Sequence, residues 1–134
     1  MSLFTKAAEL MRQAAIRDLQ GKISRVENEM KELTRQKKEY ESFIAKAITA
    51  NTYLTNASGK LTTAQEGLEK SYEGYKASGI NSAIEGRKGD ISSVKGKLNT
   101  YIETAKEKAK DLEQKIKNKQ EYLDGLNREL SSLW

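Results

Sequence analysis

The 134-residue sequence contains no cysteine, no histidine and no proline. Without cysteine the chain can form no disulfide and has no thiol nucleophile. Without histidine it lacks the commonest general base and the commonest transition-metal ligand. Zinc sites and Ser-His-Asp or Cys-His catalytic centres are therefore excluded. The lack of proline favours long helices, because loop-rich and all-β domains of this length normally place proline in their turns.

Long apolar runs are missing too. No run can span a bilayer, and the N-terminal apolar stretch carries charges, unlike a Sec signal peptide. We therefore expect synthesis in the cytoplasm, no membrane insertion, and a different route for any export. The 24 basic and 19 acidic residues are interspersed, and no aromatic residue lies within a basic cluster. This pattern is typical of a solvated surface, and no nucleic-acid partner is expected.

The composition favours a helical binding protein over an enzyme. Hydrophobic residues are 37% of the chain and charged residues 32%, which is typical of an elongated helical protein with a lean core. Lysine, aspartate and glutamate can act as catalysts only in a dry pocket that shifts their pKa values. We expect no catalytic residues, no cofactor and no metal.

Two long stretches place apolar residues at alternating spacings of three and four, the heptad pattern of a coiled coil. In the first stretch one heptad position stays apolar, whereas the other becomes polar in the middle. The second stretch runs from Ile84 to Leu133. The first comprises Ile16, Leu19, Ile23, Val26, Met30, Leu33, Tyr40, Ile44, Ala47, Leu54, Leu61 and Leu68, with the polar members Lys37, Asn51, Ser58 and Gln65.

The two stretches differ in heptad register by two residues, and we expect the change to occur in a turn at residues 78–82. Gly79 can adopt the left-handed conformation that ends a helix. Ser82 and Glu85 match the capping box that begins the next helix. Folding about this turn would place Leu33 near Leu126.

The predicted fold is therefore all-α: an elongated antiparallel helical hairpin, with one domain over residues 1–134. Arm one would cover about residues 5–77, and arm two about 83–133. An alternative has three helices, with a break near residues 56–60. Both readings stay open, since a glycine such as Gly59 costs a helix only ~1 kcal/mol.

In the hairpin, the first ~20 residues would extend beyond the second arm. Apolar residues there would lack an intramolecular partner, and exposed apolar stripes commonly mark contacts. A frayed end is the alternative for residues 1–5. The residues concerned are Leu3, Phe4, Leu10, Met11 and Ile16.

Seven of the nine glycines lie between Gly59 and Gly96. A phosphate-binding loop is a poor match, because no strand precedes it and no hydroxyl follows its lysine. The cluster is either a flexible tip or a docking surface with tyrosine anchors. The candidate partner-binding residues are Phe4, Leu10 and Met11 at the open end and Gly67, Tyr72, Gly74 and Tyr75 at the tip.

Three segments together resemble a known family: "LQGKISRVENEMKELTRQKKEYESFI", "LEKSYEGYKASGINSAI" and "DISSVKGKLNTYIETAKEKAKDLEQKIKNKQEYLDGLNREL". The chain is similar to the small helical proteins encoded beside LXG-motif toxins in Gram-positive bacteria. These are relatives of the Trp-X-Gly (Esx-like) family of type VII secretion, in which two helices meet at a Trp-X-Gly turn. Here Tyr72, Glu73 and Gly74 lie near the equivalent place, with tyrosine for tryptophan. The family's C-terminal Tyr-x-x-x-Asp/Glu export signal is missing.

The resemblance implies a targeting factor or chaperone that binds the helical N-terminal domain of an LXG-type toxin. Together with a second small helical protein, it would present the toxin to the secretion machinery. The missing export signal is consistent with a member that relies on its partner's signal. Two other classes stay open: a self-associating structural coiled coil that forms a homodimer, and an electrostatic binder of nucleic acid or acidic membranes.

Overall fold

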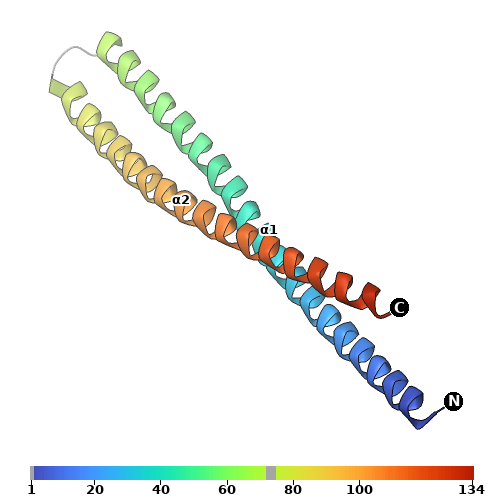
Figure 1. Cartoon of the computed structure of the whole chain (residues 1–134). Helices are drawn as coiled ribbons and strands as arrows, with labels where there is room; N and C mark the ends of the chain where they lie inside the picture. The colour runs from blue at the N-terminus through green and yellow to red at the C-terminus, as the bar shows by residue number, and fades with distance from the viewer. Residues whose placement is uncertain (1, 72–74) are drawn as a thin grey trace. The chain divides into compact units, whose positions relative to one another are not determined.

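A computed structural model of the chain describes the backbone of residues 2–71 and 75–134 and the side chains of residues 2–70 and 78–134. It contains two helices, α1 (Leu3–Ser71) and α2 (Tyr75–Ser132), shown in Figure 1. No strand occurs in the described part of the chain. The predicted all-α fold is confirmed.

Side chains support the ends and the solvent face of α1. The Ser2 hydroxyl accepts a hydrogen bond from the Thr5 backbone N–H at 3.3 Å, which is an N-cap interaction. Further along, Arg35 donates to Glu32 and Glu39, one turn away on either side. Such pairs between neighbouring turns each add a few tenths of a kcal/mol to a solvated helix.

The chain divides into two compact units, each built from one part of α1 and one part of α2. The terminal unit comprises Met1–Glu39 and Lys108–Trp134, and the central unit comprises Tyr40–Glu107. In the terminal unit the Arg12 guanidinium donates to the Leu133 carbonyl at 2.7 Å. In the central unit the Asn51 amide donates to Asn99 Oδ1 at 2.6 Å. Early residues of α1 thus meet late residues of α2, so the helices pack antiparallel within each unit, as expected for a hairpin.

The buried side chains follow the predicted heptads. We call the row of residues that each helix turns toward the other the seam. In the terminal unit Leu19 and Val26 of α1 form a core cluster with Leu123 and Leu126 of α2. The heptad spacing therefore predicted the seam of both helices correctly. The buried apolar residues are Ile16, Leu19, Val26, Ala109, Leu112, Leu123 and Leu126 in the terminal unit, and Ala47, Ile102 and Ala105 in the central unit.

The predicted turn at residues 78–82 is wrong, because these residues lie inside α2, which begins at Tyr75. The seam of α2 continues backward from Ile84 to half-buried Asn81. Packing along this row outweighs the ~1 kcal/mol that Gly79 costs within a helix. The predicted boundaries of the arms, 77 and 83, are corrected accordingly.

The three-helix alternative is wrong as well. α1 runs without interruption through residues 56–60. The Thr62 and Thr63 hydroxyls each donate at 3.1 Å to carbonyls of this segment, those of Ser58 and Gly59. Leu54 and Leu61 on either side are half-buried in the same seam, so helix packing holds the segment despite its glycine.

The earlier start of α2 shifts the pairing of the two helices. Leu126 packs with Leu19 and Val26 rather than beside Leu33 as predicted. The overhang of α1 is also shorter than the expected ~20 residues, because Arg12 already contacts the end of α2. Ile16 was expected to lack a partner, but its side chain is only 8% exposed.

Candidate partner-binding surfaces

The first turns of α1 carry large apolar side chains in solvent. Leu3, Phe4, Leu10 and Met11 are 86%, 89%, 66% and 74% exposed. The alanines between and after them are exposed as well. We call this surface the N-terminal face; it consists of Leu3, Phe4, Ala7, Ala8, Leu10, Met11, Ala14 and Ala15.

Half of the N-terminal face lies on the side of α1 turned away from α2, and the other half flanks the seam. Toward α2, the same turns present half-buried Glu9 and Arg12, followed by buried Ile16. Because a helix rotates about 100° per residue, Leu3, Ala7, Leu10 and Ala14 fall on the opposite side of the helix. These four residues therefore form an apolar surface separate from the seam, whereas Phe4, Ala8, Met11 and Ala15 lie roughly 90° from it, beside the seam. The exposure of Leu3, Phe4, Leu10 and Met11 was predicted correctly, but from the overhang of α1 alone.

Arg12 connects the polar side of the first turns of α1 to the end of α2. Its guanidinium donates to both carboxylate oxygens of Glu9, at 3.1 and 2.7 Å, as well as to Leu133. The hydrogen bonds from Arg12 lower the pKa of the Glu9 carboxyl, and the same contact raises the pKa of Arg12. This contact ties the first part of α1 to the end of α2 and leaves the N-terminal face uncovered.

The predicted site at the tip is only partly within the described residues. Gly67 is exposed in α1, and nothing lies within 4 Å of the position that a Cβ would take there. Tyr75 is the first residue of α2, and its side chain lies outside the described part. Tyr72 and Gly74 also lie outside the described residues. The docking role of the tip therefore stays a prediction.

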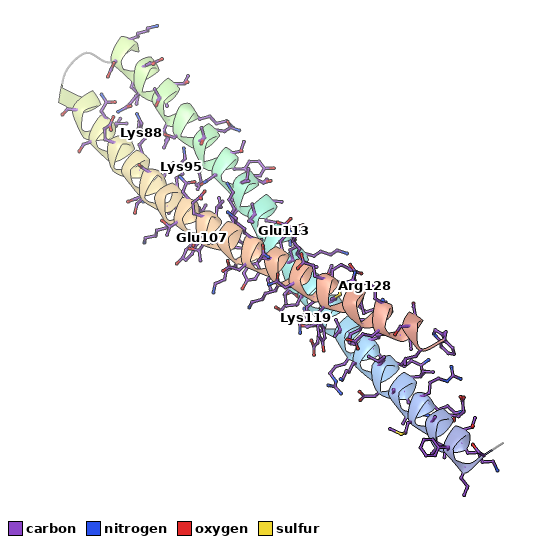
Figure 2. All side chains as sticks on the ribbon, viewed as in Figure 1. Lys88, Lys95, Glu107, Glu113, Lys119 and Arg128 are labelled. Atoms are coloured by element: carbon purple, nitrogen blue, oxygen red, sulfur yellow. The ribbon has the colours of Figure 1, made fainter. Side chains whose placement is uncertain are left out.

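The seam of the central unit includes polar side chains among its apolar ones. Gln65 donates to Glu85 at 2.7 Å and accepts from the Lys88 ammonium at 3.3 Å. Figure 2 shows Lys88 and Lys95 on α2, between the ribbons of the two helices. Neither lysine was predicted to lie in the seam, although both continue the heptad position of Ile102 backward along α2.

An ion pair crosses the seam of the terminal unit, between Lys119 of α2 and Glu29 of α1. Lys119 is labelled in Figure 2 and occupies a heptad position. Both side chains are partly solvated, so the pair helps to set the register but adds little net stability. Glu29 is also a residue that the apolar pattern alone could not identify, because it flanks the seam.

In the part of the chain that the structure describes, no group of three or more acidic side chains could hold a metal ion. The same residues include no helix long and apolar enough to cross a membrane. Comparisons of the chain with protein-family models, with curated proteins and with solved structures found no match.

Proposed function

We propose that this chain is a non-enzymatic helical targeting factor or chaperone, which binds the helical N-terminal domain of an LXG-type toxin for type VII secretion. The observation that carries the proposal is the N-terminal face, whose four large apolar side chains are all exposed. A contiguous apolar face on a solvated helix is typical of a site that a partner helix covers. The resemblance to proteins encoded beside LXG toxins supplies the class of partner.

The proposed mechanism is burial of apolar surface between helices. A helix of the toxin would lie along the N-terminal face, with Phe4, Leu10 and Met11 as its main contacts. The tip, with Gly67 and Tyr75, would be a second contact, suited to the second small helical protein. Assembly would take place in the cytoplasm, before any export of the complex.

The separation of the N-terminal face from the seam supports this mechanism. Leu19, Val26, Leu123 and Leu126 hold the terminal unit together on the other side of α1. A toxin helix can therefore bind without displacing α2. Binding requires no unfolding, and substitutions on the N-terminal face can be tested in a folded protein.

The test is recovery of the tagged full chain from its native cells, with mass spectrometry of the co-purified proteins. We expect a larger protein with an LXG-type helical N-terminal domain, and a second small helical protein, in stoichiometric amounts. The variant M11D should lose the toxin. The matched control is Y101D, which places the same charge on an exposed residue of the central unit. Recovery of the wild-type chain alone, or equal recovery of the toxin with M11D, would contradict the proposal.

A second candidate is a self-associating coiled-coil protein without a toxin client. The alternation of large and small side chains along the N-terminal face favours it, because such a surface can pack against itself. This candidate predicts a homodimer that melts cooperatively when purified alone. A client-binding chain should instead gain stability when its client is added.

A further inference from the structure

The N-terminal face consists of two parallel rows in which large and small side chains alternate. The first row is Leu3, Ala7, Leu10 and Ala14. The second row is Phe4, Ala8, Met11 and Ala15, one residue further along at each step. All eight residues are exposed. Each row therefore has the order large, small, large, small along the helix.

This order is complementary to itself when two copies run antiparallel. Across a two-fold axis, each row faces the same row of the other copy in the reverse direction. In the first row Leu3 would then face Ala14, and Ala7 would face Leu10. The second row is displaced by one residue, so the same axis pairs Phe4 with Ala15 and Ala8 with Met11 only if the two helices cross at an angle, as packed helices commonly do. Every large side chain meets a small one, which lets the two surfaces interdigitate closely.

We infer that the N-terminal face binds a second copy of this chain, with the two α1 segments antiparallel over Leu3–Ala15. A parallel arrangement is disfavoured, because it would bring large side chains together in two layers and leave space between alanines in the other two.

The residues that border the first row are compatible with this arrangement. The axis of the first row places Lys6 between Glu9 and Gln13 of the other copy. The Gln13 amide donates to Glu9 in the described structure, which leaves its carbonyl oxygen to accept from the Lys6 ammonium. Like charges therefore do not meet along this edge.

The extent of the face limits the overlap of the two copies. Beyond Ala15, the same side of α1 presents Asp18 and Lys22, which form an ion pair at 3.3 Å. α2 lies on the opposite side of α1, where Arg12 contacts Leu133. A second copy centred on the first row can thus lie along α1 on the side away from α2.

The size of the face predicts a weak, reversible dimer. Four large apolar side chains and four alanines can bury roughly 500 Å² per copy, or about 1,000 Å² in total. That total is near the lower limit for a specific interface. We expect a dissociation constant on the order of 10 μM.

The dimer does not depend on the proposed client. If a toxin helix uses the same face, the second copy and the toxin exclude each other, and the dimer is the form without client. A chain that stays monomeric alone would overturn the dimer and leave the toxin proposal standing. If no toxin is ever co-purified with the chain, the toxin proposal is overturned and the dimer still stands.

The experiment is sedimentation equilibrium of the purified full chain and three variants. L10A removes a large side chain at two symmetric places, and its dissociation constant should rise about tenfold or more. A7L/L10A exchanges the large and the small side chain between positions 7 and 10. In the antiparallel arrangement these positions face each other, so a large side chain again meets a small one. The dissociation constant of this variant should return to within roughly threefold of the wild-type value. Y101A, in the central unit, should behave as the wild type.

Circular dichroism of each variant checks that the fold is retained, as expected for substitutions at exposed positions. A wild-type chain that is monomeric up to millimolar concentration would overturn the inference. So would a dimer that L10A leaves unchanged, because it would use another surface. A dimer that L10A weakens and A7L/L10A fails to restore would overturn the antiparallel arrangement, because only that arrangement pairs positions 7 and 10.

Discussion

The terminal and central units use the same two helices and the same heptad spacing, but their interfaces differ in chemistry. The terminal unit buries branched apolar side chains from both helices, such as Val26 and Leu126. In the central unit the only buried side chains among the described residues are two alanines and an isoleucine. Gln65 and Lys88 take up seam positions there instead. Heptad spacing therefore determines which residues face the partner helix, whereas the side chains at those positions determine how strongly the helices hold together.

The two units also differ in how many glycines their helices contain, and again the central unit is the weaker of the two. Among the described residues, the central unit has six glycines, and an added Cβ would meet nothing within 4 Å at any of them. The terminal unit has two, Gly21 and Gly125. Each helical glycine costs ~1 kcal/mol relative to alanine. The central unit thus combines weaker packing with weaker helix propensity, and we expect its amides to exchange with solvent first.

The largest expected effect is on the core of the terminal unit. L126A should lower the free energy of unfolding by about 3 kcal/mol, because it leaves a cavity among buried side chains. L61A, at a half-buried position of the central unit, should cost about 1 kcal/mol. Urea unfolding followed by circular dichroism measures both values. Equal losses would show that the two interfaces contribute alike.

The next effect should strengthen the central unit. G86A/G89A/G96A adds three methyl groups at open positions on α2 and should raise stability by roughly 2 kcal/mol in total. Hydrogen exchange should slow in the central unit. The control G21A, also at an open position, should slow exchange in the terminal unit only. Unchanged exchange in the triple variant would mean that helix propensity does not limit this unit.

A smaller gain is expected at Asn51. Its Oδ1 atom is buried and has no hydrogen-bond partner among the described residues, although its amide nitrogen donates to Asn99. N51L should raise the free energy of unfolding by about 1 kcal/mol, because it removes a polar group from the seam. N99A should lower it by a similar amount, since it deprives the Asn51 amide of its acceptor. A loss with N51L would show that the asparagine pair stabilises the central unit.

The smallest effect concerns pH and the exposed surface of the terminal unit. Hydrogen bonds from Arg35 lower the pKa of Glu32 from 4.5 to about 2. A lowered folded pKa gives a contribution that is present above pH 4.5 and is lost as the pH falls toward 2. The wild type should therefore lose slightly more stability than E32Q between these values, and high salt should reduce the difference. Acid titrations of both proteins, followed by circular dichroism, test this; parallel curves would rule out a contribution from the pair.

Much of the hairpin could be predicted from the spacing of its apolar residues. From Ile16 to Leu33 this spacing follows the period of a single helix, so each residue supports the same prediction. The turn could not be placed in this way. Gly79 and the Ser82–Glu85 pattern are signals worth about 1 kcal/mol each, and seam packing through Asn81 and Ile84 outweighed them. Lys88 and Lys95 were missed because the heptad position of Ile102 becomes polar toward the start of α2 and was followed there only through its apolar members.

The sequence by itself determined that the chain forms two long helices and which residues of each helix face the other. Both follow from the 3.6-residue period of a single helix, which is a local property. Only the tertiary structure decided where α2 begins, which residues meet across the seam, and that Leu3, Ala7, Leu10 and Ala14 point away from α2. These depend on summed packing between segments far apart in the chain. If α2 began one helical turn earlier or later, every pair of residues that face each other across the seam would change. No short stretch of sequence determines where α2 begins.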